Sequence, residues 1–138
     1  MGRTFTPEAR AAQMRSIRKT DTRPEIAVRR LAHLLGYRFR LHRRDLPGSP
    51  DLVFPGPRKA IFVHGCFWHQ HEGCRLARQP KTRPDYWPKK LARNVERDAE
   101  VRQRLSDDGW EVLVVWECET GDVEALRDRI IGFLGLRK

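Results

Sequence analysis

The sequence of 138 residues lacks any run of about 20 apolar residues, so no segment is predicted to span a membrane. Its first residues have no apolar stretch behind their positive charge, so we expect no secretory signal. Internal repeats and low-complexity tracts are also missing. The length is that of one domain, and we expect a single domain over residues 1–138.

Cysteine is scarce, with three residues, and any set of disulfides would leave one cysteine over. Acidic side chains are also few: 18 Asp and Glu stand against 28 Lys and Arg, which gives a formal net charge of +10. The excess is concentrated in residues 1–44, which carry 12 basic and 3 acidic side chains. Guanidinium groups fork onto phosphate oxygens and release counterions, so this distribution favours a polyanionic partner over a merely solubilising charge.

The chain alternates between segments with helical and with strand-like patterns. The elements that these patterns predict are, in order, a helix over 22–36, strands over 37–42, 51–54 and 60–63, an irregular loop over 64–88, a helix over about 88–107, a strand over 110–116 and a helix from Asp122. This order predicts a mixed sheet with helices on both faces, which is an α/β fold.

Three details of this fold can be predicted further. The strand over 110–116 is the most apolar, so we expect it to be central in the sheet. Residues 7–19 could form a short basic helix, but their apolar residues are so sparse that a basic arm over about residues 1–20 is favoured. Along the helix over about 88–107, the side chains expected to face inward are Leu91, Val95, Ala99, Val101 or Arg102, and Leu105.

A candidate metal site uses every cysteine of the chain. Cys66, His71 and Cys74 lie in the irregular loop, and Cys118 follows the strand over 110–116. Together they form a Cys₃His set, which zinc takes in closed structural sites and which would hold the loop against the sheet. Three buried thiols and a surface histidine are the alternative, but cysteine rarely clusters with Gly, His and Glu unless it binds something.

A candidate catalytic cluster lies beside that loop. His64 directly follows a predicted buried strand, and His69 lies within the loop. Asp51 opens the neighbouring strand of the same predicted hairpin. A carboxylate and two imidazoles in this arrangement are the groups that acid–base catalysis uses.

Longer motifs resemble known nucleases. Pro50-Asp51 followed by two apolar strands resembles the PD-(D/E)xK nuclease core, although Phe62-Val63-His64 stands where that core has an acid-x-Lys pair. Six further motifs, in sequence order, closely resemble the very short patch repair (Vsr) DNA mismatch endonucleases. They are Met14-Arg15-Ser16-Ile17, Pro47-Gly48-Ser49-Pro50-Asp51, Phe62-Val63-His64-Gly65-Cys66-Phe67-Trp68-His69-Gln70-His71, Thr82-Arg83-Pro84-Asp85-Tyr86-Trp87, Asn94-Val95-Glu96-Arg97-Asp98 and Val115-Trp116-Glu117-Cys118.

The resemblance implies an enzyme that nicks one DNA strand on the 5′ side of the thymine in a T:G mismatch. It assigns Asp51 as the Mg²⁺ ligand and gives the same ion the backbone carbonyl of Val63, where similar enzymes often carry Thr. His69 is then the base or water-orienting group, and His64 bonds the phosphate or the metal waters. Glu25 would hold a metal-bound water, although a capping-box role also explains that residue. The cysteines and His71 correspond to the structural zinc site of the family.

The resemblance also implies how DNA is contacted. Phe67, Trp68 and Trp87 are wedges between base steps, although adjacent aromatics could instead cover the edge of the sheet. The remaining assignments are Met14 and Ile17 in the opposite groove, Lys90 and Asn94 at the mismatch edges, and Arg15, Arg18 and Lys19 on phosphates.

The resemblance therefore implies a monomeric enzyme whose partner is double-stranded DNA with a mismatch, and cooperation with other mismatch-repair proteins stays open. We expect it to work in the cytoplasm, associated with the nucleoid of a prokaryote. Two alternatives stay open: a related nuclease of broader mismatch or restriction-type specificity, and a non-catalytic zinc-stapled DNA-binding module. An RNA-associated protein would explain the charge but not the histidine and aspartate cluster.

Overall fold

The computed structural model of the chain describes residues 22–135. Within that range four strands form one mixed sheet in the order β1-β2-β3-β4. β1 (Arg40–Leu41), β2 (Leu52–Phe54) and β3 (Lys59–His64) pair antiparallel, and β4 (Glu111–Trp116) pairs parallel to β3. The predicted α/β fold with a mixed sheet is confirmed.

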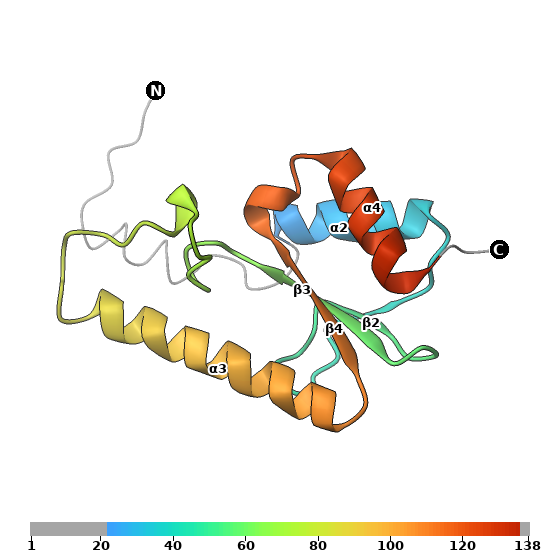
Figure 1. Cartoon of the computed structure of the whole chain (residues 1–138), viewed down its shortest axis with the longest axis horizontal. Coiled ribbons are helices and arrows are strands. Elements are labelled where there is room, and N and C mark those ends of the chain that lie inside the picture. The colour runs from blue at the N-terminus through green and yellow to red at the C-terminus, as the bar shows by residue number, and fades with distance from the viewer. Residues whose placement is uncertain (1–21, 136–138) are drawn as a thin grey trace.

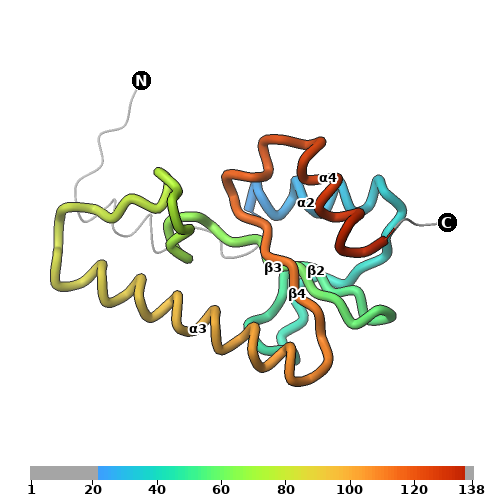
Figure 2. Tube along the Cα trace, viewed as in Figure 1, coloured from blue at the N-terminus to red at the C-terminus, as the bar shows by residue number. Residues whose placement is uncertain are grey.

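Helices cover both faces of this sheet. α2 (Arg23–Leu34) and α4 (Val123–Leu134) lie on one face, and α3 (Trp87–Asp107) runs along the other (Figure 1). The chain leaves β3 through an irregular loop, turns into α3 and returns along β4 (Figure 2). Short 3-10 turns, η1 (Arg75–Ala77) and η2 (Glu117–Glu119), lie in the loop and after β4. No helix among the described residues is long and apolar enough to cross a membrane.

The sequence explains where the helices begin. The Thr22 hydroxyl accepts a hydrogen bond from the Glu25 N–H at 3.4 Å, and the Asp122 carboxylate accepts one from the Ala125 N–H at 3.1 Å. Each cap satisfies a backbone donor that has no partner within the helix. α2 ends before Gly36, whose φ of 87° is in the left-handed region that glycine adopts easily.

One hydrophobic core fills the space between the sheet and the α2–α4 face. Burial of these side chains is the main force that holds the two helices on the sheet. The buried members of the core are Val28, Ala32, Leu52, Phe54, Ile61, Val115, Leu126 and Ile130.

Three sequence predictions need correction. The strand predicted over 37–42 is two residues long, since only residues 40–41 pair with β2, although Tyr37 and Phe39 pack on Phe54. The strand expected to be central, β4, is at an edge of the described sheet. Parallel pairing with β3 and cover from α3 account for its apolar sequence, because a strand covered on both faces need not be central.

The third correction concerns α3. Val95 is 43% exposed and Ala99 is also exposed, whereas Leu91 and Leu105 are buried as predicted. The amino-terminal half of α3 extends past the strands and lies beside the irregular loop (Figure 1). Its polar side chains Asn94 and Asp98 contact that loop, so the helix has little apolar surface to bury there.

The turn before β2 approaches α3 closely. Gly48 has a φ of +74°, and a Cβ atom at this position would lie 2.5 Å from Val101 Cγ1. Both the backbone conformation and the space therefore require glycine. This contact fixes the turn that leads into Asp51.

Candidate active site and metal centre

The candidate site residues gather at one edge of the sheet, which is formed by the ends of the strands and not by the outer strand β4. β3 and β4 run parallel and end at this edge, while β2 runs antiparallel to β3 and begins there. Asp51 therefore precedes β2 where His64 ends β3, and Cys118 follows β4 nearby. The carboxyl ends of parallel strands are a frequent location for ligand sites in α/β proteins.

The first group at this edge contains Asp51, Glu25 and His42, whose ligand atoms all lie within 4.8 Å of one another. Asp51 Oδ2 accepts a hydrogen bond of 2.6 Å from the Val63 N–H. The two nitrogens of His42 lie 3.5 Å from Glu25 Oε2 and 3.9 Å from Asp51 Oδ1. Glu25, which is 2% exposed, thus directs its side chain into the site although its N–H is held by the helix cap.

Burial, and after it the Glu25 carboxylate, raises the pKa of Asp51 to about 7. Two carboxylates taken out of water at this separation repel each other when both are ionised. A divalent cation between them would remove that penalty, and oxygen ligands are those that Mg²⁺ prefers. The donor set therefore fits the predicted Mg²⁺, with Asp51 as direct ligand and Glu25 beside it.

The second group contains His64, His69 and Asp98. The two imidazoles stack with centroids 3.8 Å apart and planes at 7°. His69 Nδ1 lies 2.6 Å from Asp98 Oδ2, so Nδ1–H donates to the carboxylate and Nε2 is left to accept a proton. Burial, and then the neighbouring His69, lowers the pKa of His64 to about 4, so His64 is neutral near pH 7. Among the described residues its buried Nδ1 has no hydrogen-bond partner.

The structure thus brings together Asp51, Val63 and Glu25, and it stacks His64 on His69, but it also adds two residues that the sequence analysis missed. His42 could have been found from the hairpin, because its backbone N–H pairs with the Asp51 carbonyl at 3.3 Å. Asp98 could have been found from its motif, because it lies one helical turn after Asn94 on α3.

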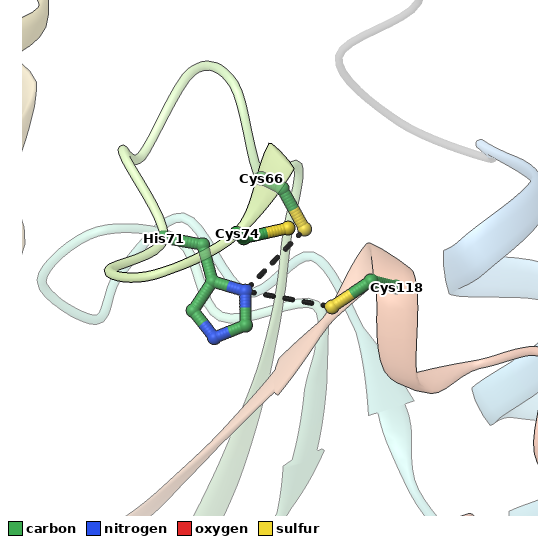
Figure 3. Close-up of side chains that lie close together, drawn as sticks. All are labelled: Cys66, His71, Cys74 and Cys118. Atoms are coloured by element: carbon green, nitrogen blue, oxygen red, sulfur yellow. Dashed lines mark hydrogen bonds between the residues drawn. The ribbon is translucent and has the colours of Figure 1, made fainter. Parts of the chain in front are cut away.

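The Cys₃His cluster is assembled as the spacing predicted. The donor atoms of Cys66, His71, Cys74 and Cys118 all lie within 4.8 Å of one another. Figure 3 shows three of the side chains coming from the loop and Cys118 coming from the short helical turn after β4, with the sulfur atoms of Cys66 and Cys118 directed toward the His71 ring. His71 Nδ1 is 3.7 Å from Cys66 Sγ and 3.4 Å from Cys118 Sγ.

This donor set fits zinc. Burial raises the pKa of the Cys66 thiol to about 12, so a deprotonated thiolate there needs a cation for stabilisation. Three thiolates and one imidazole are a complete tetrahedral set for Zn²⁺. A bound ion would join the loop to the segment after β4, since the ligands come from two segments that lie far apart in the sequence.

Hydrogen bonds within the loop shape the cluster locally. The backbone N–H groups of His69 and His71 donate to the carbonyls of Gly65 and Cys66 at 3.1 and 3.0 Å. The Gln70 amide donates to the Phe67 carbonyl at 2.7 Å. These tight turns place His69 toward α3 and His71 toward the cysteines, so two histidines separated by one residue belong to two different groups.

The predicted wedge residues form one aromatic cluster. The ring centroids of Phe67, Trp68 and Trp87 are 5.1 to 5.9 Å apart, and all three side chains are half-buried. Asn94, assigned to the mismatch edge, donates to the Trp68 carbonyl at 3.0 Å, and Lys90 is exposed. The predicted arm over residues 1–20 lies outside the described residues, as do Met14, Arg15, Ile17, Arg18 and Lys19.

A mixed sheet with helices on both faces, and with two close carboxylates and a histidine pair at one end, is consistent with an α/β nuclease fold. The model of the DNA mismatch endonuclease Vsr family matches residues 3–75. The Type II nicking enzyme V.XorIIP of Xanthomonas oryzae pv. oryzae is 53% identical over 130 residues, which cover 94% of this chain and 95% of that protein. The DNA mismatch endonuclease Vsr of Escherichia coli is 45% identical over 125 residues, 88% of this chain and 80% of that one. The chain belongs to the Vsr family of DNA endonucleases.

Proposed function

We propose that this endonuclease nicks one DNA strand on the 5′ side of the thymine in a T:G mismatch and so initiates very short patch repair of deaminated 5-methylcytosine. The observation that carries the proposal is that a carboxylate group and a histidine pair lie at the same end of the sheet, since Asp51 accepts a hydrogen bond from Val63, the residue that precedes His64. The similarity to the Escherichia coli protein, a DNA mismatch endonuclease, supports the choice of substrate.

Asp51, the Val63 carbonyl and Glu25 would hold Mg²⁺ in this reaction. When bound, Mg²⁺ supplies a hard cation that polarises the phosphate and lowers the pKa of water. Val63 in place of Thr leaves this arrangement possible, because its contribution is a backbone carbonyl. The Val63 N–H fixes Asp51 from the other side by its hydrogen bond of 2.6 Å.

His69 and His64 take different roles in proton transfer. Asp98 holds the Nδ1 proton of His69, so Nε2 of His69 is the atom that accepts a proton from water. His64 is kept neutral by burial and donates a hydrogen bond to a phosphate oxygen from one ring nitrogen. The Cys₃His cluster would hold Zn²⁺, and the bound ion would fix the loop that carries His69.

Mismatch recognition is assigned to the aromatic cluster of Phe67, Trp68 and Trp87, which zinc would hold rigid. Inserting such a wedge costs the unstacking of a base step, and this cost is lowest where pairing is already poor. Lys90 and Asn94 lie beside the cluster on α3, where they would meet the mismatched bases. Met14 and Ile17 act from the opposite groove, and Arg15, Arg18 and Lys19 contact phosphates.

A strand-specific nicking assay tests the proposal. A T:G duplex, its T:A control and the other mispairs are incubated with the protein and Mg²⁺, with Asp51→Ala as the inactive control. We expect one nick 5′ of the mismatched thymine, none in the T:A duplex and none with the variant. Cleavage of both strands, or of the T:A duplex at an equal rate, would contradict the proposal.

A second candidate is a nuclease of broader mismatch or restriction-type specificity. The similarity to several Type II nicking enzymes favours it. The same panel of mispairs separates the two candidates, because a broad enzyme nicks several mispairs at similar rates.

A further inference from the structure

One tryptophan contacts both histidine-containing clusters. Trp116, the last residue of β4, stacks on His71 of the Cys₃His cluster with centroids 4.2 Å apart and planes at 6°. It also meets His64 edge-on at 5.3 Å and 75°. His64 stacks on His69, which bonds Asp98, so a continuous row of side chains runs from the metal cluster to α3.

The backbone fixes Trp116 firmly. It pairs in register with His64 across the parallel β3–β4 ladder, and its N–H donates to Glu119 Oε1 at 2.7 Å. Cys118 follows two residues later in η2. An ion bound by Cys118 and His71 would therefore hold the indole from its own chain and from the ring stacked on it.

His64, in contrast, is held mainly by ring contacts. Its Nδ1 has no hydrogen-bond partner in the described part of the chain. Its ring contacts the rings of His69 and Trp116, and the ring centroid of Phe62 lies 5.7 Å from its own. Without the indole, one side of the imidazole pair would lose its packing. A catalytic group misplaced by about 1 Å can cost a factor of about 100 in rate.

We infer that Trp116 is a positioning residue through which the metal cluster holds His64 and His69 in their reactive arrangement. The inference rests on the proposed function, because it assumes that these histidines act on the scissile phosphate. It gives the zinc site a second role: the site sets the geometry of the catalytic imidazoles as well as holding the loop.

The test compares Trp116→Leu, Trp116→Phe and Trp110→Leu in the whole chain. Trp110 immediately precedes β4 at its other end, where it packs under Arg58, so it is a matched control away from the site. We expect Trp116→Leu to keep one zinc per chain and to lower kcat about tenfold or more, with KM changed less than about threefold. Trp116→Phe restores most of kcat, because a flat ring still packs on both histidines.

A second readout does not depend on activity. Ring resonances of His64 in protein labelled with ¹³C-histidine report its contacts with Trp116. We expect them to shift in Trp116→Leu and to stay in place in Trp110→Leu.

A double-mutant cycle that combines Trp116→Leu with His71→Cys measures the coupling between the indole of Trp116 and the ring of His71. This variant keeps four zinc ligands but removes the ring stacked on Trp116. We expect the loss of kcat caused by Trp116→Leu to be smaller in the His71→Cys background than in the wild type.

The inference would be overturned if Trp116→Leu left both kcat and the His64 resonances unchanged. Additive losses of kcat in the double-mutant cycle would also overturn it. Loss of zinc from Trp116→Leu would overturn it as well, because the indole would then serve to retain the metal. A wild-type chain that fails to nick a T:G duplex would instead refute the proposed function, while the resonances would still decide whether Trp116 positions His64.

Discussion

The two faces of the sheet differ in what they bury. On the α2–α4 face, eight buried apolar side chains form one continuous core. On the α3 face, α3 buries Leu91 and Leu105, while its amino-terminal half bonds the loop through Asn94 and Asp98. The α2–α4 face supplies most of the apolar burial that stabilises the fold. The α3 face carries polar contacts that add little stability but hold the loop in position beside α3.

The apolar core that stabilises the fold and the histidine pair of the candidate active site thus lie on opposite sides of the sheet. Glu25 is the exception, because it belongs to α2 and yet its carboxylate reaches the edge where Asp51 lies. Substitutions can therefore be chosen that affect one property and spare the other.

Asp51→Asn is expected to have the largest effect. The amide keeps the size of the side chain and an acceptor for the Val63 N–H, but it lacks the charge that would hold Mg²⁺. Nicking of a T:G duplex should fall about 1,000-fold or more, equivalent to several kcal/mol of transition-state stabilisation. Single-turnover rates with excess protein measure this loss, and DNA binding serves as the control. A residual rate within about tenfold of wild type would contradict the assignment.

Ile130→Ala and Val95→Ala test the other half of the comparison. Ile130 is fully buried against the sheet, so its truncation should lower the free energy of unfolding by about 3 kcal/mol. Val95, on the opposite face and 43% exposed, should lose less than about 0.5 kcal/mol. Urea unfolding measures both values. Equal losses would show that α3 contributes to the core as much as α4 does.

Asp98→Asn should reduce kcat by about 10- to 100-fold, because the amide no longer fixes the proton on Nδ1 of His69. Nicking rates and unfolding curves are measured together, with Asp98→Glu as the conservative variant that should recover part of the rate. A rate loss that is matched by an equal loss of stability, or no recovery with Glu, would argue against a positioning role.

The raised pKa of Asp51 predicts a stability effect with a definite pH dependence. Its carboxyl has a pKa of about 7 when folded, above the ordinary value, so its favourable contribution is complete only below about pH 4 and is lost as the pH rises through 7. Asp51→Asn should therefore stabilise the magnesium-free protein by about 1–3 kcal/mol at pH 8 and by less at pH 5. Urea unfolding at the two pH values measures the gain; a larger gain at the lower pH would reverse the sign and refute the argument.

Trp68→Ala is expected to have the smallest effect. Discrimination between a T:G duplex and paired DNA should fall about tenfold, while affinity for paired DNA changes less than about twofold, because the indole is used where stacking is already weak. Competition binding measures both, and Leu76→Ala, an exposed apolar residue of the same loop, is the control. Equal losses on both duplexes would refute the wedge.

Much of this arrangement could be predicted from local patterns. Capping residues and apolar periods predicted α2, β2, β3 and α3 closely, because each is decided within its own segment. The Cys₃His cluster was predicted because cysteine is rare and chemically distinctive. The predicted hairpin placed Asp51 beside the end of the next strand, and Asp51 does accept a hydrogen bond from Val63 there.

The errors have a common physical cause, since each depends on neighbours in space. β4 is as apolar as a central strand because both its faces are covered, and its own sequence does not say that it has one neighbour in the described sheet. Val95 fits a helical apolar period, but α3 extends beyond the strands where that position would be buried. His42 and Asp98 are ordinary polar residues until the hairpin and α3 bring them to the site.

The close approach of Gly48 to Val101 has a consequence for how this enzyme can vary. Any larger residue in that turn would have to push the long helix outward, and the helix carries Asp98, while the turn itself leads into Asp51. A single methyl group at Gly48 would thus disturb both groups of the candidate active site at once. Directed evolution of new specificity should therefore keep Gly48 unchanged. Variation should instead be introduced at exposed positions of the irregular loop that follows β3.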